Sequence, residues 1–184
     1  MQHTLVALVE NKPGVLTRVA SLFQRRAFNI DSLTVGRTEN SGISRITIVV
    51  DTNKENAERL TAYLNKLINI VWVEDITESP MVSRDLAMVK VGVNAANRAE
   101  VMQLVDVFRA RIIDVGNDSL MIEITGNEEK IEGFIETLKP FGILEMVRAG
   151  VVAMGRGANP LGNSVNGKNG KGNGKNALEM DSLP

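Results

Sequence analysis

The stretch HTLVALVENKPGVLTRVASLF, residues 3–23, decides the fold because its hydrophobic period changes at a single step. Residues 3–9 form an apolar run of strand length. After Pro13 and Gly14 the apolar residues take the spacing of one helix face, at Val15, Leu16, Val19, Leu22 and Phe23. The chain is therefore predicted to begin with a strand that leads directly into a helix.

The rest of the first half completes a βαββαβ order. Residues 30–38 and 43–51 are β-rich segments, separated by the turn-prone residues 39–42. The apolar spacing then predicts a helix from Lys54 to Leu67 and a strand over residues 70–77.

The second half repeats this order. Residues 79–85 contain Pro80 and Ser83 and are predicted to be a linker. The elements expected beyond it are a strand at 86–93, a helix carrying Val101, Leu104, Val105 and Phe108, strands at 111–116 and 119–125, a helix carrying Ile131, Phe134, Ile135 and Leu138, and a strand at 143–153. The sequence thus predicts an α+β fold of two tandem ferredoxin-like βαββαβ units, at residues 1–78 and 86–156.

Two features extend this prediction beyond the single units. Residues 157–184 are rich in Gly, Asn and Lys, and we expect them to form a disordered tail. Each unit has about 75 residues, a size at which one core rarely supplies more than about 5 kcal/mol. We therefore expect the units to pair, making the protein at least a homodimer.

Composition excludes several classes of function. A net charge of -1 and 4% aromatic residues argue against a nucleic-acid surface, which needs clustered basic groups and stacking platforms. The chain has no Cys, and its single His3 lies in an apolar stretch without a recognisable orienting partner, so we expect neither a metal site nor a catalytic group. No apolar run is long enough to span a membrane, and we expect a cytoplasmic protein.

The start of the first helix carries the strongest functional signal. Its first turn has no acidic residue, although a helix start carries about half a positive charge. The free backbone donors begin at Gly14, Val15 and Leu16, and they suit a carboxylate. Asn11 precedes this turn and Asn29 follows the helix, and both are also typical of ordinary caps and turns. From these residues alone, an anion site and a purely structural turn both remain open.

The same residues resemble a known family. The run from Glu10 through Asn29–Ile30 to Val35 resembles the ACT domain, an amino-acid-sensing module, and more narrowly the small regulatory subunit of acetohydroxyacid synthase (acetolactate synthase). Residues 44–47, 112–115, 150–152 and 156–157 are also similar to that family. The resemblance covers residues 1 to about 157 and does not extend to the tail.

The resemblance implies a non-catalytic subunit that activates a large catalytic subunit and confers feedback inhibition by valine in branched-chain amino acid biosynthesis. Thiamine diphosphate would belong to the large subunit, and this chain would need no cofactor of its own. In this family the effector lies between paired ACT domains. By position, Asn11, Gly14, Val15 and Leu16 would form one side of the site, and Asn29 with Ile30 of the neighbouring chain the other. Leucine or isoleucine would bind more weakly.

Two other classes of function remain open. A free-standing amino-acid sensor or transcriptional coregulator would bind the amino acid but no synthase. A small hydrolase on the same fold, such as an acylphosphatase, is disfavoured because its Gly-rich phosphate loop is absent after the first strand.

Overall fold

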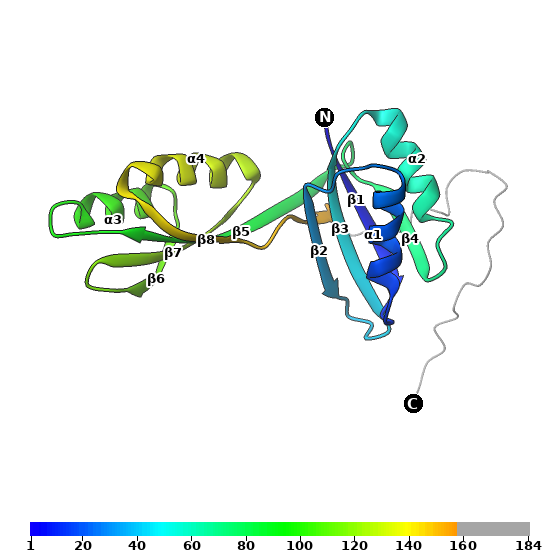
Figure 1. The fold of residues 1–184 in the computed structure, drawn as a ribbon, viewed down its shortest axis with the longest axis horizontal. Coiled ribbons are helices and arrows are strands. Elements are labelled where there is room, and N and C mark those ends of the chain that lie inside the picture. Colours follow the sequence, from blue (N-terminus) through cyan, green and yellow to red (C-terminus); the bar gives the residue numbers. More distant parts are fainter. Residues whose placement is uncertain (158–184) are drawn as a thin grey trace.

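The computed structural model describes residues 1–157, which form two α+β units joined by one long strand (Figure 1). In each unit a four-stranded antiparallel sheet carries two helices on one face. This confirms the predicted pair of ferredoxin-like units. The expected tail at 157–184 falls outside the described residues, apart from Gly157.

The first unit has the predicted order of elements. These are β1 (Gln2–Glu10), α1 (Val15–Arg25), β2 (Ser32–Arg37), β3 (Ile43–Asp51), α2 (Lys54–Leu64) and β4 (Ile70–Asp75). The strands lie in the order β2-β3-β1-β4, so β1 and β3 are central and β2 and β4 form the edges. The β2–β3 turn is closed by Asn40, whose side chain accepts a hydrogen bond from the Gly42 N–H.

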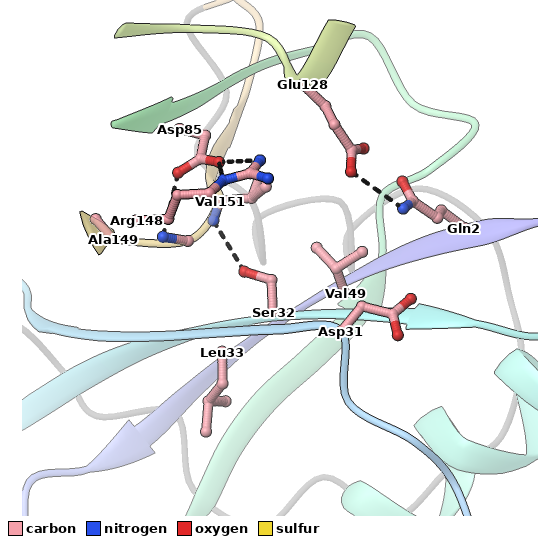
Figure 2. Close-up of a pocket in the computed structure, with 11 residues that line it drawn as sticks. Gln2, Asp31, Ser32, Leu33, Val49, Asp85, Glu128, Arg148, Ala149 and Val151 are labelled. Atoms are coloured by element: carbon pink, nitrogen blue, oxygen red, sulfur yellow. Dashed lines mark hydrogen bonds and ion pairs between the residues drawn. The ribbon is translucent and has the colours of Figure 1, made fainter. Parts of the chain in front are cut away.

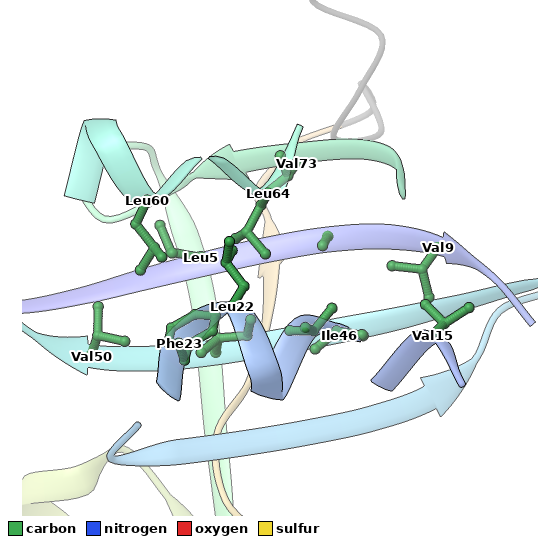
Figure 3. Close-up of a cluster of buried hydrophobic side chains, with 13 residues drawn as sticks. Leu5, Val9, Val15, Leu22, Phe23, Ile46, Val50, Leu60, Leu64 and Val73 are labelled. Atoms are coloured by element: carbon green, nitrogen blue, oxygen red, sulfur yellow. The ribbon is translucent and has the colours of Figure 1, made fainter. Parts of the chain in front are cut away.

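The hydrophobic residues on one face of the sheet and on the inner faces of the two helices form a single core between them (Figure 3). Leu5 of β1 is paired with Ile48 of β3, and both side chains are fully buried. Phe23 of α1 and Leu60 of α2 are buried in the same cluster. Ser32 and Thr34 of β2 pair with Val49 and Thr47 of β3. Because successive side chains of a strand point to opposite faces, they lie on the sheet face opposite the helices.

The second unit repeats this arrangement with its own core. Its elements are β5 (Met81–Gly92), α3 (Arg98–Val107), β6 (Arg111–Val115), β7 (Ser119–Gly126), α4 (Glu128–Leu138), the 3-10 turn η1 (Lys139–Phe141), β8 (Ile143–Arg148) and β9 (Val152–Gly155). Four of its strands lie in the order β6-β7-β5-β8. Phe108 and Phe134 meet in its core with ring centroids 5.1 Å apart.

The linker expected at residues 79–85 is largely a strand. Residues 81–85 form the first part of β5, where Met81 pairs with Gly155 and Arg84 with Val152 of β9. Ala153 of β9 is buried with Val6 of β1 and Ile76, so this two-stranded ribbon covers part of the first sheet's open face. The local sequence gives no sign of a strand there because the pairing partner comes from about 70 residues later in the chain.

Other element boundaries shift by a few residues. The strand expected at 143–153 is divided into β8 and β9 by residues 149–151, where Gly150 has a φ of +89°. The helix expected to reach Leu67 ends at Leu64, and the strand expected at 70–77 ends at Asp75.

None of the helices within residues 1–157 is long and apolar enough to cross a membrane.

Candidate functional site

No side chain of α1 or of its N-cap residue accepts a hydrogen bond from the backbone N–H groups at the start of this helix. Gly14 occupies the N-cap position with a φ of +83°, a conformation that favours glycine, and no side chain caps the helix. The first turn contains no acidic residue. The first helical hydrogen bond is donated by the Arg18 N–H to the Gly14 carbonyl, at 3.1 Å. The positive end of the helix is therefore left uncompensated by its own sequence.

The open donors differ in part from those expected. The Val15 N–H donates to the Lys12 carbonyl at 3.4 Å, because the turn folds back on Lys12. Within residues 1–157, the N–H groups of Gly14, Leu16 and Thr17 donate to no backbone carbonyl. These three groups, and not the consecutive run 14–16, are the donors available to an anion.

Val15 and Leu16 have different places at this helix end. Val15 is only 4% exposed and belongs to the hydrophobic core, so its side chain is not part of an open site. Leu16 is 44% exposed and presents an apolar side chain beside the open donors.

Asn11 ties the turn to the neighbouring hairpin. Its backbone N–H donates to the Gly42 carbonyl at 2.7 Å, and its Nδ2 donates to the Ser41 carbonyl at 3.1 Å. The hairpin thus uses one of the two Nδ2 N–H groups of Asn11, which leaves the second N–H and the side-chain oxygen for other partners.

A polar network missed by the sequence reasoning supports the same loop. Asn69, with a φ of +79°, donates from Nδ2 to the Glu10 carboxylate and accepts from the Arg18 guanidinium. Its carbonyl accepts from the Glu10 N–H at 2.9 Å. Hydrogen bonds from Lys12 first, and then from Asn69, lower the pKa of Glu10 below its usual value. The only sequence signal was an Asn between the second helix and the following strand, a common place for a left-handed residue.

Asn29 and Ile30 lie at the opposite end of α1. Asn29 is exposed and donates from Nδ2 to the Asp31 carboxylate at 2.9 Å, while Ile30 is half-buried against the core. The eleven residues of α1 separate this pair from Gly14, a span of about 16 Å at 1.5 Å per residue. One chain therefore does not bring the two halves of the expected site together.

A cavity of about 320 Å³ lies where the two units meet, and we call it the inter-unit cavity (Figure 2). Asp31 and Ser32 line it from the first unit, and Asp85, Glu128 and Arg148 from the second. Burial alone would lower the pKa of Arg148, but hydrogen bonds and charge from Asp85 and Glu132 raise it above its usual value, so the side chain stays a cation. The sequence reasoning singled out none of these residues as a site, because Asp31 and Arg148 are far apart in the chain.

His3 has a partner that the sequence did not reveal. Its Nδ1 lies 2.7 Å from Asp75 Oδ2, and the residue is 3% exposed. Nε2 has no hydrogen-bond partner among the described residues. Within residues 1–157 no group of three or more His, Asp or Glu side chains is arranged to hold a metal ion. The contact between His3 and Asp75 links β1 to β4 and stabilises the first sheet.

Comparison with known proteins places both units in one family. The family described as an AHAS small subunit-like ACT domain matches residues 5–72, and that described as the small subunit of acetolactate synthase matches residues 84–157. The acetolactate synthase small subunit of Mycolicibacterium smegmatis is 48% identical over 160 residues, covering 87% of this chain and 94% of its own. That of Bacillus subtilis is 45% identical, covering 85% of this chain and 92% of its own.

A solved structure agrees with these sequence matches. The acetolactate synthase small subunit of Thermotoga maritima is similar to this chain with a TM-score of 0.79 and 40% sequence identity. The match covers 86% of this chain and 99% of the other. The similarity therefore extends across both units.

Proposed function

The chain belongs to the family of acetolactate synthase small subunits, and on that premise we propose that it activates a large catalytic subunit and makes it sensitive to valine. The large subunit would condense two 2-keto acids with thiamine diphosphate that it binds itself. This chain would contribute no catalytic residue and would act in the cytoplasm as part of branched-chain amino acid biosynthesis.

The uncapped start of α1 is the main observation that supports an effector site. Valine would place its carboxylate on the N–H groups of Gly14, Leu16 and Thr17, where the helix end offers partial positive charge. Gly14 has no neighbouring atom within 4 Å of the position a Cβ would take, so the approach is open. The exposed side chain of Leu16 would contact the isopropyl group of the effector.

The second half of the site would come from a neighbouring chain. Asn29 and Ile30 lie about one helix length from Gly14 in the same chain, so a homodimer that sets the α1 helices antiparallel would place them opposite the partner's helix start. Because Asn29 Nδ2 already donates to Asp31, its side-chain oxygen is free to accept from the ammonium group. The Asp31 carboxylate behind it adds attraction for the same positive charge.

The expected affinity follows from these contacts. Charged hydrogen bonds contribute roughly 1.5 to 3 kcal/mol each, and burial of the isopropyl group adds about 1.5 to 3 kcal/mol. The entropy of association offsets part of this, which leaves a Kd in roughly the micromolar to millimolar range. Leucine and isoleucine differ by one methylene and should bind about 1 to 3 kcal/mol more weakly.

Calorimetric titration of the purified chain with valine tests the site. Gly14→Asp would place a carboxylate on the positive helix end and abolish valine binding. Gly142→Asp is the matched control, because Gly142 has a similar φ of +85° and equally open surroundings in the second unit. The effector site is wrong if Gly14→Asp binds valine as well as the control does.

Mixing two variants that each fail to bind valine tests whether the site is shared between chains. Gly14→Asp damages the helix-start half and Asn29→Ala the facing half. In a mixed twofold dimer one site would carry both changes and the other neither, so an equimolar mixture should bind about one valine per four chains. A site contained within one chain would gain nothing from mixing.

A further inference from the structure

Residues 149–151, the connection between β8 and β9, touch both units of the molecule (Figure 2). The Val151 N–H donates to the Ser32 hydroxyl of β2 at 2.9 Å. One residue earlier, the Gly150 N–H donates to the Asp85 carboxylate at 3.2 Å. Adjacent peptide groups are thus held by different units.

On the side of the first unit, Gly150 is packed so closely that a Cβ would require a neighbouring hydroxyl to shift. A Cβ at this position would lie 2.7 Å from Ser32 Oγ and 3.0 Å from Thr34 Oγ1. Its φ of +89° adds strain for any residue other than glycine. The backbone of this connection therefore rests directly on the open face of β2.

On the side of the second unit, the connection is anchored to a buried charge. Asp85 is 3% exposed and accepts from Arg148 Nε and Nη2 at 2.9 and 2.6 Å. It also accepts from its neighbour, the Leu86 N–H, at 2.8 Å. Arg148 in turn contacts Glu132 of α4. A displacement of Gly150 would act on β5, β8 and α4 together.

The contact lies next to the effector site in the chain. Ser32 begins β2 and follows Ile30 by two residues, and Asp31 between them accepts from Asn29 on one side and lines the inter-unit cavity on the other. The Asp31 N–H donates to the Val49 carbonyl at 2.9 Å, so residues 29–32 are tied to the sheet as one short segment. A ligand that orders Asn29 and Ile30 would therefore also shift or fix the position of Ser32.

We propose that the contact of Gly150 and Val151 with Ser32 transmits the occupancy of the effector site to the second unit. This proposal rests on the proposed function, because it assumes that an effector binds at residues 29–30. When the start of β2 shifts, Ser32 either carries Gly150 and Val151 with it or loses the hydrogen bond from Val151. Close-packed contacts of this kind have low compressibility, so a shift of Ser32 would be transmitted to the second unit.

The test separates valine binding from valine inhibition. Gly150→Ala would push residues 150–151 away from Ser32 and Thr34 without changing any residue of the effector site. Gly142→Ala is the matched control, since it carries a similar backbone strain, with a φ of +85°, but meets no neighbouring atom within 4 Å. Calorimetry on each full-length chain measures the Kd for valine, and the synthase reconstituted with the large subunit measures inhibition.

We expect Gly150→Ala to bind valine with a Kd within about threefold of wild type, while inhibition at saturating valine falls to less than about half. The control should retain both. Full inhibition by Gly150→Ala would overturn the proposal, because the contact would then not be needed. A wild-type chain that binds no valine would instead overturn the proposed function, and the two failures are distinct.

Ser32→Ala provides a second variant if Gly150→Ala fails to fold. It removes the hydroxyl that accepts from Val151 and adds no atoms, so the overall packing is retained. Weakened inhibition with unchanged valine binding is expected again. Unchanged inhibition in a folded Ser32→Ala chain would contradict the proposal.

Discussion

At the scale of single residues, Gly14 and Asn69 shape the loop between β1 and α1 in different ways. Gly14 takes the left-handed conformation at the helix start and leaves its donors open. Asn69 takes the same kind of conformation in the loop before β4 and uses its side chain to connect Glu10 with Arg18. Both ends of the loop are thus fixed before any ligand arrives, which lowers the entropic cost of binding.

Asn69→Gly should weaken valine binding several-fold. Glycine accepts the φ of +79° without strain, so the change removes only the side-chain bonds to Glu10 and Arg18. Loss of those bonds frees the end of β1 and the first turn of α1. The measurement is the calorimetric Kd for valine, with Asn65→Gly as a control after the end of α2. An unchanged Kd in Asn69→Gly would mean that this network does not position the loop.

At the scale of elements, the hydrophobic periods predicted most of the helices and strands, because each period reports local burial. The change of hydrophobic period at Pro13 and Gly14 predicted the end of β1 and the start of α1 to within a few residues. The open helix start could also be predicted, since it depends on which residues are absent from one turn. The hydrogen bond from Val15 to Lys12 could not, because it depends on how the turn closes.

Features that depend on distant pairing were not accessible from the sequence. The first part of β5 becomes a strand only because β9 supplies its partner, and His3 finds Asp75 only because β1 and β4 are adjacent. Gly150 fits against Ser32 for the same reason. Local patterns carry no information on which segments meet across the sheet.

The His3–Asp75 contact between β1 and β4 gives a pH-dependent contribution to stability. Burial alone would raise the pKa of Asp75, but hydrogen bonds from Thr77 and His3 lower it below its usual value. The lowered pKa means that the ionised carboxylate stabilises the folded state. This contribution is present above the ordinary aspartate pKa of about 3.9 and is lost as the pH falls through the lowered value.

Asp75→Asn should therefore reduce the free energy of unfolding at pH 7 by about 1 kcal/mol, the size of one or two net hydrogen bonds. Thermal unfolding of wild type and variant across pH checks this. The difference should persist down to about pH 4 and disappear only below it. Glu74→Gln, one residue earlier on β4, is the control. A difference that vanished near neutral pH would show that the Asp75 charge is not its source.

At the scale of the whole molecule, the two units share a fold but have different proposed roles. The first unit holds the proposed effector site at its α1 helix, which a second copy of the chain would complete. The second unit is joined to it by the continuous strand β5, by the packing of Ala153 of β9 against Val6 and by the contact of Gly150 with Ser32. An effector that fixes the relation between two chains can therefore also act on the relation between the two units.

The proposed role of this chain is to make a synthase both more active and sensitive to valine. The most direct measurement is acetolactate formation by the purified large subunit from the same source, with and without this chain, as valine is titrated. We predict that the chain raises the rate and that valine reverses the increase. A rate that is indifferent to the chain, while the chain alone still binds valine, would contradict the claim and indicate a free-standing amino-acid sensor.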